Sequence, residues 1–197
     1  MESIEIFEQI SNRLVEATMM HNSFDELLVY LGFEGFAKIH HYQFYDETHE
    51  MKMVNEYAVE HLNCLIYNEQ VDAKKYIPSE FRNVKRNDVN RLDKRDVIRY
   101  IMETWIAWET ATKELYSNFE VHLSENHDIA STLFVDKLIH GVDYELRRAT
   151  DLLTLLQSCD YDLDTMVVLQ NRYKAMYCGM IISMFKEMKG ECEYDRR

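Results

Sequence analysis

Residues 31–61 read LGFEGFAKIHHYQFYDETHEMKMVNEYAVEH, and this stretch decides the fold. It opens with a turn, because Gly32 and Gly35 lie close together and glycine readily takes the left-handed conformation that ends helices. After this turn the apolar residues recur at helical spacing, which predicts one helix over residues 36–61. The stripe that we expect to face the interior comprises Ile39, Tyr42, Asp46, His49, Met53 and Tyr57.

Asp46 and His49 are the polar members of that stripe and lie one helical turn apart. Burying polar groups costs free energy unless they find partners. A carboxylate and an imidazole one turn apart can converge on one cation, and this mixture of oxygen and nitrogen donors suits iron, manganese or zinc. An Asp–His hydrogen bond or a pair on the helix surface would use the same two residues. The spacing alone therefore leaves a metal site and a structural pair both open.

Outward from this segment, the chain indicates four more long helices. Their apolar periodicity places them at about residues 4–31, 94–124, 129–157 and 165–189. Short loops join the first two helices and the next two, whereas residues 62–92 form a long polar link. A short loop makes antiparallel neighbours, and a link of this length can run the full length of a bundle. We therefore expect a four-helix bundle with one long crossover, in which helices two and three run parallel.

Composition supports a helical protein that favours cations. Among 197 residues there are only 5 glycines and 1 proline, too few turn residues for most β-rich folds. The net charge of −13 disfavours nucleic acid and anionic lipid as partners and suits metal ions. The four cysteines include no C-x-x-C pair, and no window of about 18 apolar residues is present. These features predict a cytoplasmic protein that does not bind membranes.

Two further helices also place an acid on an apolar stripe. In the third helix Glu109 lies between Trp105 and Tyr116, and in the fourth Glu145 is in line with Val142. Each acid could instead sit at the edge of its stripe and face water. Taken together, acids or imidazole from three helices match the way in which di-iron carboxylate centres are built within bundles. A bound dication would relieve the mutual repulsion of such carboxylates.

Several separated motifs match those of one known family. The glycine turn is followed by a helix with a glutamine, an acid-x-x-His motif and a Met-rich stretch. The link resembles a P-S-E-W segment, and the next two helices resemble H-E-x-x-x-T-K and D-F-A-T-Y-N-F. The matching residues here are Gly32–Phe36, Gln43, Asp46, His49, Met51–Met53, Tyr76–Phe81, Trp108–Lys113 and Asp128–Phe134. On these residues the chain resembles the prokaryotic non-haem ferritins, over roughly residues 10–155 and in the same order.

The resemblance implies a set of metal ligands. Asp46 falls where that family has its bridging glutamate, and His49 falls on the histidine ligand. Glu109 falls on the third-helix glutamate, and Glu145 on the fourth-helix acid near the site. Aligning Asp46 requires a one-residue gap, and without that gap the pair would be Glu47 and Glu50.

The chain also departs from the family pattern. The first-helix glutamate has no clean equivalent, since its position falls on Leu14 or Thr18, with Glu16 between them. Acids near further iron positions are replaced, although His140 and Asp143 stand close by and could compensate. Three acids and one histidine fall short of the usual di-iron set. We therefore expect weak binding, or one ion rather than two.

The sequence thus predicts an all-α, ferritin-like four-helix bundle with one long crossover and an additional long C-terminal helix. Residues 1–160 would form the bundle, and residues 161–197 the fifth helix and tail of the same domain. The expected function is iron binding, with oxidation of iron(II) by dioxygen or peroxide and storage. Two alternatives stay open, namely a scaffold with a degenerate site and a different di-metal oxidase or oxygenase. Apolar residues on more than one face of the fifth helix predict a homo-oligomer.

Overall fold

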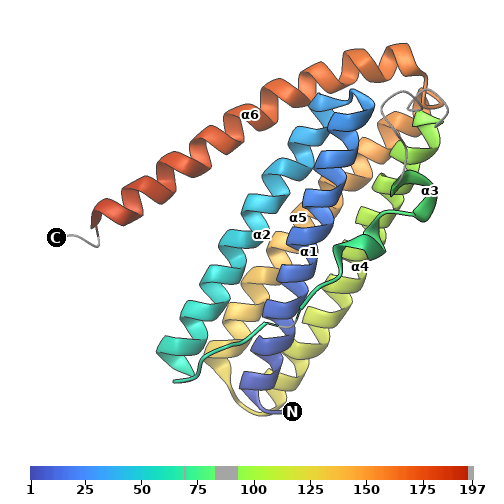
Figure 1. Cartoon of the computed structure of the whole chain (residues 1–197). Coiled ribbons are helices and arrows are strands. Elements are labelled where there is room, and N and C mark those ends of the chain that lie inside the picture. Colours follow the sequence, from blue (N-terminus) through green and yellow to red (C-terminus); the bar gives the residue numbers. More distant parts are fainter. Residues whose placement is uncertain (69, 83–92, 195–197) are drawn as a thin grey trace.

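The computed structural model describes residues 1–68, 70–82 and 93–194. Every regular element in this part of the chain is helical, as expected (Figure 1). Two short elements, η1 (Ala73–Tyr76) and α3 (Ser79–Arg82), lie in the long link. The five long helices are α1 (Ser3–Leu31), α2 (Glu34–His61), α4 (Lys94–Glu125), α5 (Ile129–Ser158) and α6 (Leu163–Tyr194).

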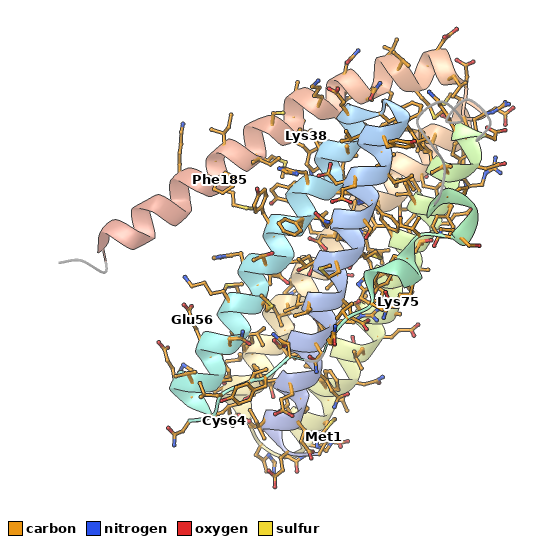
Figure 2. The ribbon with its side chains drawn as sticks, in the orientation of Figure 1. Met1, Lys38, Glu56, Cys64, Lys75 and Phe185 are labelled. Carbon is orange, nitrogen blue, oxygen red and sulfur yellow. The ribbon has the colours of Figure 1, made fainter. Side chains whose placement is uncertain are left out.

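The helices have the predicted order and directions. Helix α1 packs antiparallel to α2, and α4 packs antiparallel to α5 (Figure 1). After α2 the link runs back along the bundle, so α2 and α4 are parallel. Lys75 of this link lies alongside α1, where its Nζ is 2.6 Å from Glu16 Oε1 (Figure 2). The crossover predicted from the length of residues 62–92 is therefore present; residues 69 and 83–92 lie outside the described part.

Local chemistry sets the helix ends. Gly32 has φ +86°, a left-handed conformation that glycine adopts without steric cost, and it ends α1. The carboxylates of Asp93 and Asp128 accept hydrogen bonds from Arg95 N and Ser131 N at the starts of α4 and α5. Helix α1 continues without a break through Asn22–Asp25, because polar side chains there bond within the helix itself.

The bundle core consists of two apolar clusters with a polar layer between them. One cluster is built around Phe24 and Trp105, and the other around Phe7 and Tyr116. Along α4, Glu109 comes between the tryptophan of the first cluster and the tyrosine of the second, and it is buried. The polar layer therefore lies within the bundle and not at its end.

Helix α6 packs on the outer side of α2 and then diverges from the bundle (Figure 1). Gly35 N donates a hydrogen bond to Gln170 Oε1 at 3.0 Å, which fixes the start of α2 against α6. Tyr177 is buried in this contact. Several apolar side chains of α6 stay exposed, namely Val167, Val168, Met176, Ile182 and Phe185. No helix in the described part of the chain has the length and apolar character needed to cross a bilayer.

Gly35→Ala is expected to destabilise the protein by about 1–3 kcal/mol, as overpacking does. A Cβ atom at this position would lie 2.0 Å from the backbone oxygen of Gln170, so α6 would have to move away from α2. Gly179→Ala is the control, because a Cβ there meets nothing within 4 Å and alanine favours the helix. Chemical denaturation measures both, and equal stability of the Gly35 variant and wild type would contradict the close packing.

Candidate metal site

Midway along α2, the face that points into the bundle carries acidic residues. The buried residues of α2 include Phe36, His40, Gln43, Glu47 and Val54, which follow one another at helical spacing. This stripe is displaced by one residue, or about 100° of helical rotation, from the one expected from Tyr42 and Met53. The displacement brings Glu47 into the interior, where its exposed fraction is 6%.

Four glutamates from three helices surround one small enclosed cavity. Glu47 and Glu50 come from α2, Glu109 from α4 and Glu145 from α5. The cavity volume is about 10 Å³, which is room for roughly one water molecule or one metal ion. The other lining residues are Arg13, Leu14, Ala17, Trp108, Thr112, Tyr116 and Val142.

Burial shifts the protonation of all four carboxyl groups in the same direction. It raises the pKa of Glu109 to about 7 and that of Glu50 to about 8. Burial, followed by the charges of neighbouring acids, raises the pKa of Glu47 and of Glu145 well above the usual range. The metal-free cavity therefore retains protons near neutral pH, and a divalent cation would displace them.

His21 of α1 adds an imidazole beside the cavity. Its Nε2 lies 3.9 Å from Glu109 Oε1, and one ligand atom each from His21, Glu47 and Glu109 lie within 4.8 Å of one another. This Nε2 is buried and has no hydrogen-bond partner among the described residues. Burial lowers the pKa of His21 to about 3, so the ring is neutral. A neutral imidazole among carboxylates is a donor set that fits iron, manganese or zinc.

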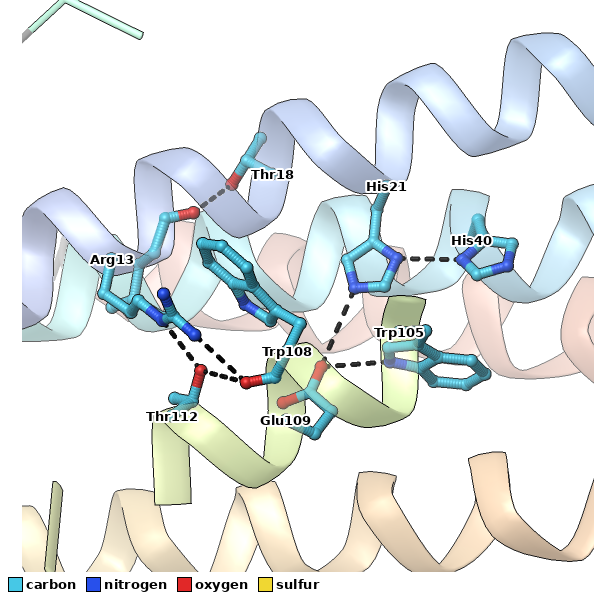
Figure 3. Close-up of polar contacts among 9 residues, drawn as sticks. Arg13, Thr18, His21, His40, Trp105, Trp108, Glu109 and Thr112 are labelled. Atoms are coloured by element: carbon cyan, nitrogen blue, oxygen red, sulfur yellow. Dashed lines mark hydrogen bonds and ion pairs between the residues drawn. The ribbon is translucent and has the colours of Figure 1, made fainter. Parts of the chain in front are cut away.

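Further contacts hold Glu109 and Arg13 in place (Figure 3). Trp105 Nε1 donates a hydrogen bond of 3.0 Å to Glu109 Oε1. Arg13 donates to Thr112 Oγ1 at 2.8 Å and to the Trp108 carbonyl at 3.0 Å, and its guanidinium stacks on the Trp108 ring. Arg13 is the one cation in the described lining of the cavity, so it partly balances the acids.

Of the four metal ligands expected first from the sequence, two line the cavity and two lie outside its lining. Glu109 and Glu145 line the cavity. Asp46 is half-buried beside Tyr42, Arg148 and Glu145, at the edge of the cluster. His49 lines a separate open groove along α2 with Lys52 and is not among the described residues that line the cavity, so its role as a metal ligand stays a prediction.

Of the other candidates, the pair of acids that aligns with the family without a gap lies at the cavity. Glu47 and Glu50 both line the cavity. Glu16 instead pairs with Lys75 of the link. His140 is exposed, with Nε2 3.7 Å from Asp136, and Asp143 Oδ1 pairs with Lys113 at 2.6 Å. These last three candidates have partners outside the cavity, so the structure does not bring them to it.

His21 and Arg13 were missed by the sequence reasoning. The signal for His21 was present, because it follows Leu14 by seven residues and Ala17 by four, on the buried face of α1. Arg13 gave no such signal, since long basic side chains usually reach solvent.

No family model and no curated relative matches the chain. Among solved structures, an open-pore ferritin from the archaeon Archaeoglobus fulgidus superimposes with a TM-score of 0.73. It is 14% identical, and the match covers 87% of this chain and 94% of that one. A variant of PmFTN studied in crystals soaked in iron gives a TM-score of 0.68 at 17% identity, covering 86% and 96% of the two chains. This chain therefore has the ferritin-like fold, at a large distance in sequence.

Proposed function

We propose that the cavity binds iron(II) and oxidises it with dioxygen or peroxide, in support of iron storage. The observation that carries this proposal is the convergence of four glutamates from α2, α4 and α5 on one enclosed cavity. The resemblance of the fold to ferritins supports the same conclusion. Iron is here the substrate of the protein.

The residues of the chain have distinct roles in this proposal. Glu47, Glu109 and His21 offer the closest group of donor atoms and would hold the ion. Glu50 and Glu145 complete the negative lining, and protons leave the carboxyl groups as the cation enters. The hydrogen bond from Trp105 orients Glu109, as outer partners of metal ligands commonly do. In the redox step each iron(II) gives one electron to the oxidant and becomes iron(III).

We propose one tightly bound ion per chain, from the balance of charge in the cavity. Four glutamates line the cavity where the sequence suggested fewer, and their full ionisation would give four negative charges. Arg13 offsets one of these charges, and Leu14 of α1 lines the cavity without adding a charge. A second dication would therefore meet too little negative charge at close range.

An anaerobic iron(II) titration followed by exposure to air tests the function. We expect one tight iron per chain and oxidation on admission of air, measured by calorimetry and with an iron(II)-specific dye. Glu109→Ala should abolish both, because it removes a cavity ligand. Glu114→Ala is the matched control, since this exposed glutamate lies on the same helix. Two irons per chain would contradict the assigned stoichiometry.

Absence of iron binding would favour the alternative of a scaffold with a degenerate site. Leu14 and Arg13 in the lining are the observations that favour this alternative. The other alternative, a different di-metal oxidase or oxygenase, has no observation in its favour from α6, since no described residue of this helix lines the cavity. Self-association through the exposed apolar residues of α6 stays a prediction.

A further inference from the structure

His40 of α2 lies directly behind His21, on the side away from Glu109 (Figure 3). The two Nδ1 atoms are 2.9 Å apart, and the two rings are stacked with centroids 5.1 Å apart and an interplanar angle of 24°. Both residues are essentially inaccessible, with exposed fractions of 0% and 1%. One of these nitrogens must donate and the other accept, because two lone pairs at this distance would repel.

Aromatic rings enclose the imidazole pair. Trp105 presents its ring edge-on to both imidazoles, with centroid distances of 5.8 Å to His21 and 5.1 Å to His40. Phe24 packs against His40 at 5.3 Å. Both rings are shielded from solvent, and a hydrogen bond between the two Nδ1 atoms requires a lone pair on one of them. Among the described hydrogen bonds, His40 Nδ1 is the acceptor available to a proton on His21 Nδ1.

The cavity side decides the direction of this hydrogen bond. His21 Nε2 is the nitrogen near Glu109, and a metal ion can bind there only through its lone pair. The single proton of the neutral ring must then lie on Nδ1. A buried N–H without an acceptor is costly, so this tautomer depends on a lone pair at His40 Nδ1.

We infer that His40 is a positioning residue that accepts a hydrogen bond from His21 Nδ1–H and thereby presents the His21 Nε2 lone pair to a divalent metal. This inference rests on the proposed function and names a residue that itself touches no metal. It makes the imidazole pair a unit that spans α1 and α2. Loss of such an outer partner typically weakens metal binding by about 10–100-fold.

Cobalt(II), which reports its ligands by paramagnetic proton NMR, is the probe for this inference. In the wild-type protein we expect one strongly shifted imidazole N–H signal that exchanges slowly with solvent, because the proton is buried and hydrogen-bonded. His21→Leu should remove this signal. Absence of the signal from cobalt-loaded wild type would overturn the inference without requiring any His40 variant to fold.

Two variants of nearly equal size separate the hydrogen bond from packing. His40→Leu removes the acceptor, whereas His40→Asn places an oxygen near the position of Nδ1. We expect cobalt(II) affinity to fall about 10–100-fold in the leucine variant and to recover largely in the asparagine variant. His41→Leu is the control, since His41 pairs with Asp25 away from the cavity and should not change the affinity.

The outcomes distinguish this inference from the proposed function. Equal affinities of wild type and His40→Leu would overturn the role of His40 while leaving the metal site intact. Equal losses in the leucine and asparagine variants would also overturn it, because packing would then explain the effect. If wild type bound neither cobalt(II) nor iron(II), both the inference and the proposed function would fall.

Discussion

Glu47→Gln is expected to weaken iron(II) binding by at least about 100-fold while making the metal-free protein more stable at pH 8. The loss of binding follows because Glu47 belongs to the closest group of donor atoms. The gain in stability follows because burial and four neighbouring acids make its ionised form unfavourable. Glutamine has nearly the same shape and carries no charge. Isothermal titration and thermal melting measure the two effects.

The opposite signs of these two effects identify the cluster as a binding site. A purely structural glutamate would lower stability when replaced, and would leave iron binding unchanged. Glu60→Gln is the matched control, because Glu60 is an exposed residue of the same helix and both quantities should stay at their wild-type values. A less stable Glu47→Gln protein at pH 8 would contradict the electrostatic account.

The metal-free protein should lose stability as the pH rises from 6.5 to 8.5. Glu109 and Glu50 have folded pKa values of about 7 and 8, above the ordinary value of 4.5. In this range the unfolded chain has released protons that the folded protein still holds, so a higher pH favours unfolding. Each retained proton contributes up to about 1.4 kcal/mol per pH unit. Below pH 6.5 the neutral His21 and His40 act in the opposite direction.

A bound divalent metal should remove this loss, because it keeps the carboxylates ionised. Metal affinity should accordingly increase with pH over the same range. Melting curves with a chelator and with saturating manganese(II) compare the two states. A melting temperature of the metal-free protein that stays constant or rises between pH 6.5 and 8.5 would contradict the pKa shifts.

Helix number, order and direction could be predicted from the sequence because they depend on features averaged over many residues. Apolar periodicity extends over whole helices, and the length of residues 62–92 leaves room for a crossover. Gly32 marks a helix end through a conformation that few other residues tolerate. These signals do not depend on the exact rotation of any helix.

The candidate site depends on that rotation, and the stripe expected on α2 differs by one residue from the buried one. On α2, Tyr42 and Tyr57 suggested an interior stripe, yet both pack at its edge, against Tyr177 and Phe134. The amphipathic tyrosine ring suits such a boundary position. Glu47, the alternative to Asp46 that needs no gap in the alignment, shares its cavity with acids from α4 and α5. Because those partners come from distant parts of the chain, local periodicity could not identify them.

The polar layer between the two apolar clusters also has a consequence for how the helices align. Leucine and isoleucine faces tolerate sliding, since one turn of displacement exchanges one apolar contact for another. Displacing α4 by one turn would put Glu109 among the apolar residues around Phe24 and separate it from His21 of α1 and Glu47 of α2. A buried charge without partners is costly, so the layer selects one axial register. The same carboxylates that make the cavity a place for cations thereby fix how far each helix is shifted along the bundle axis.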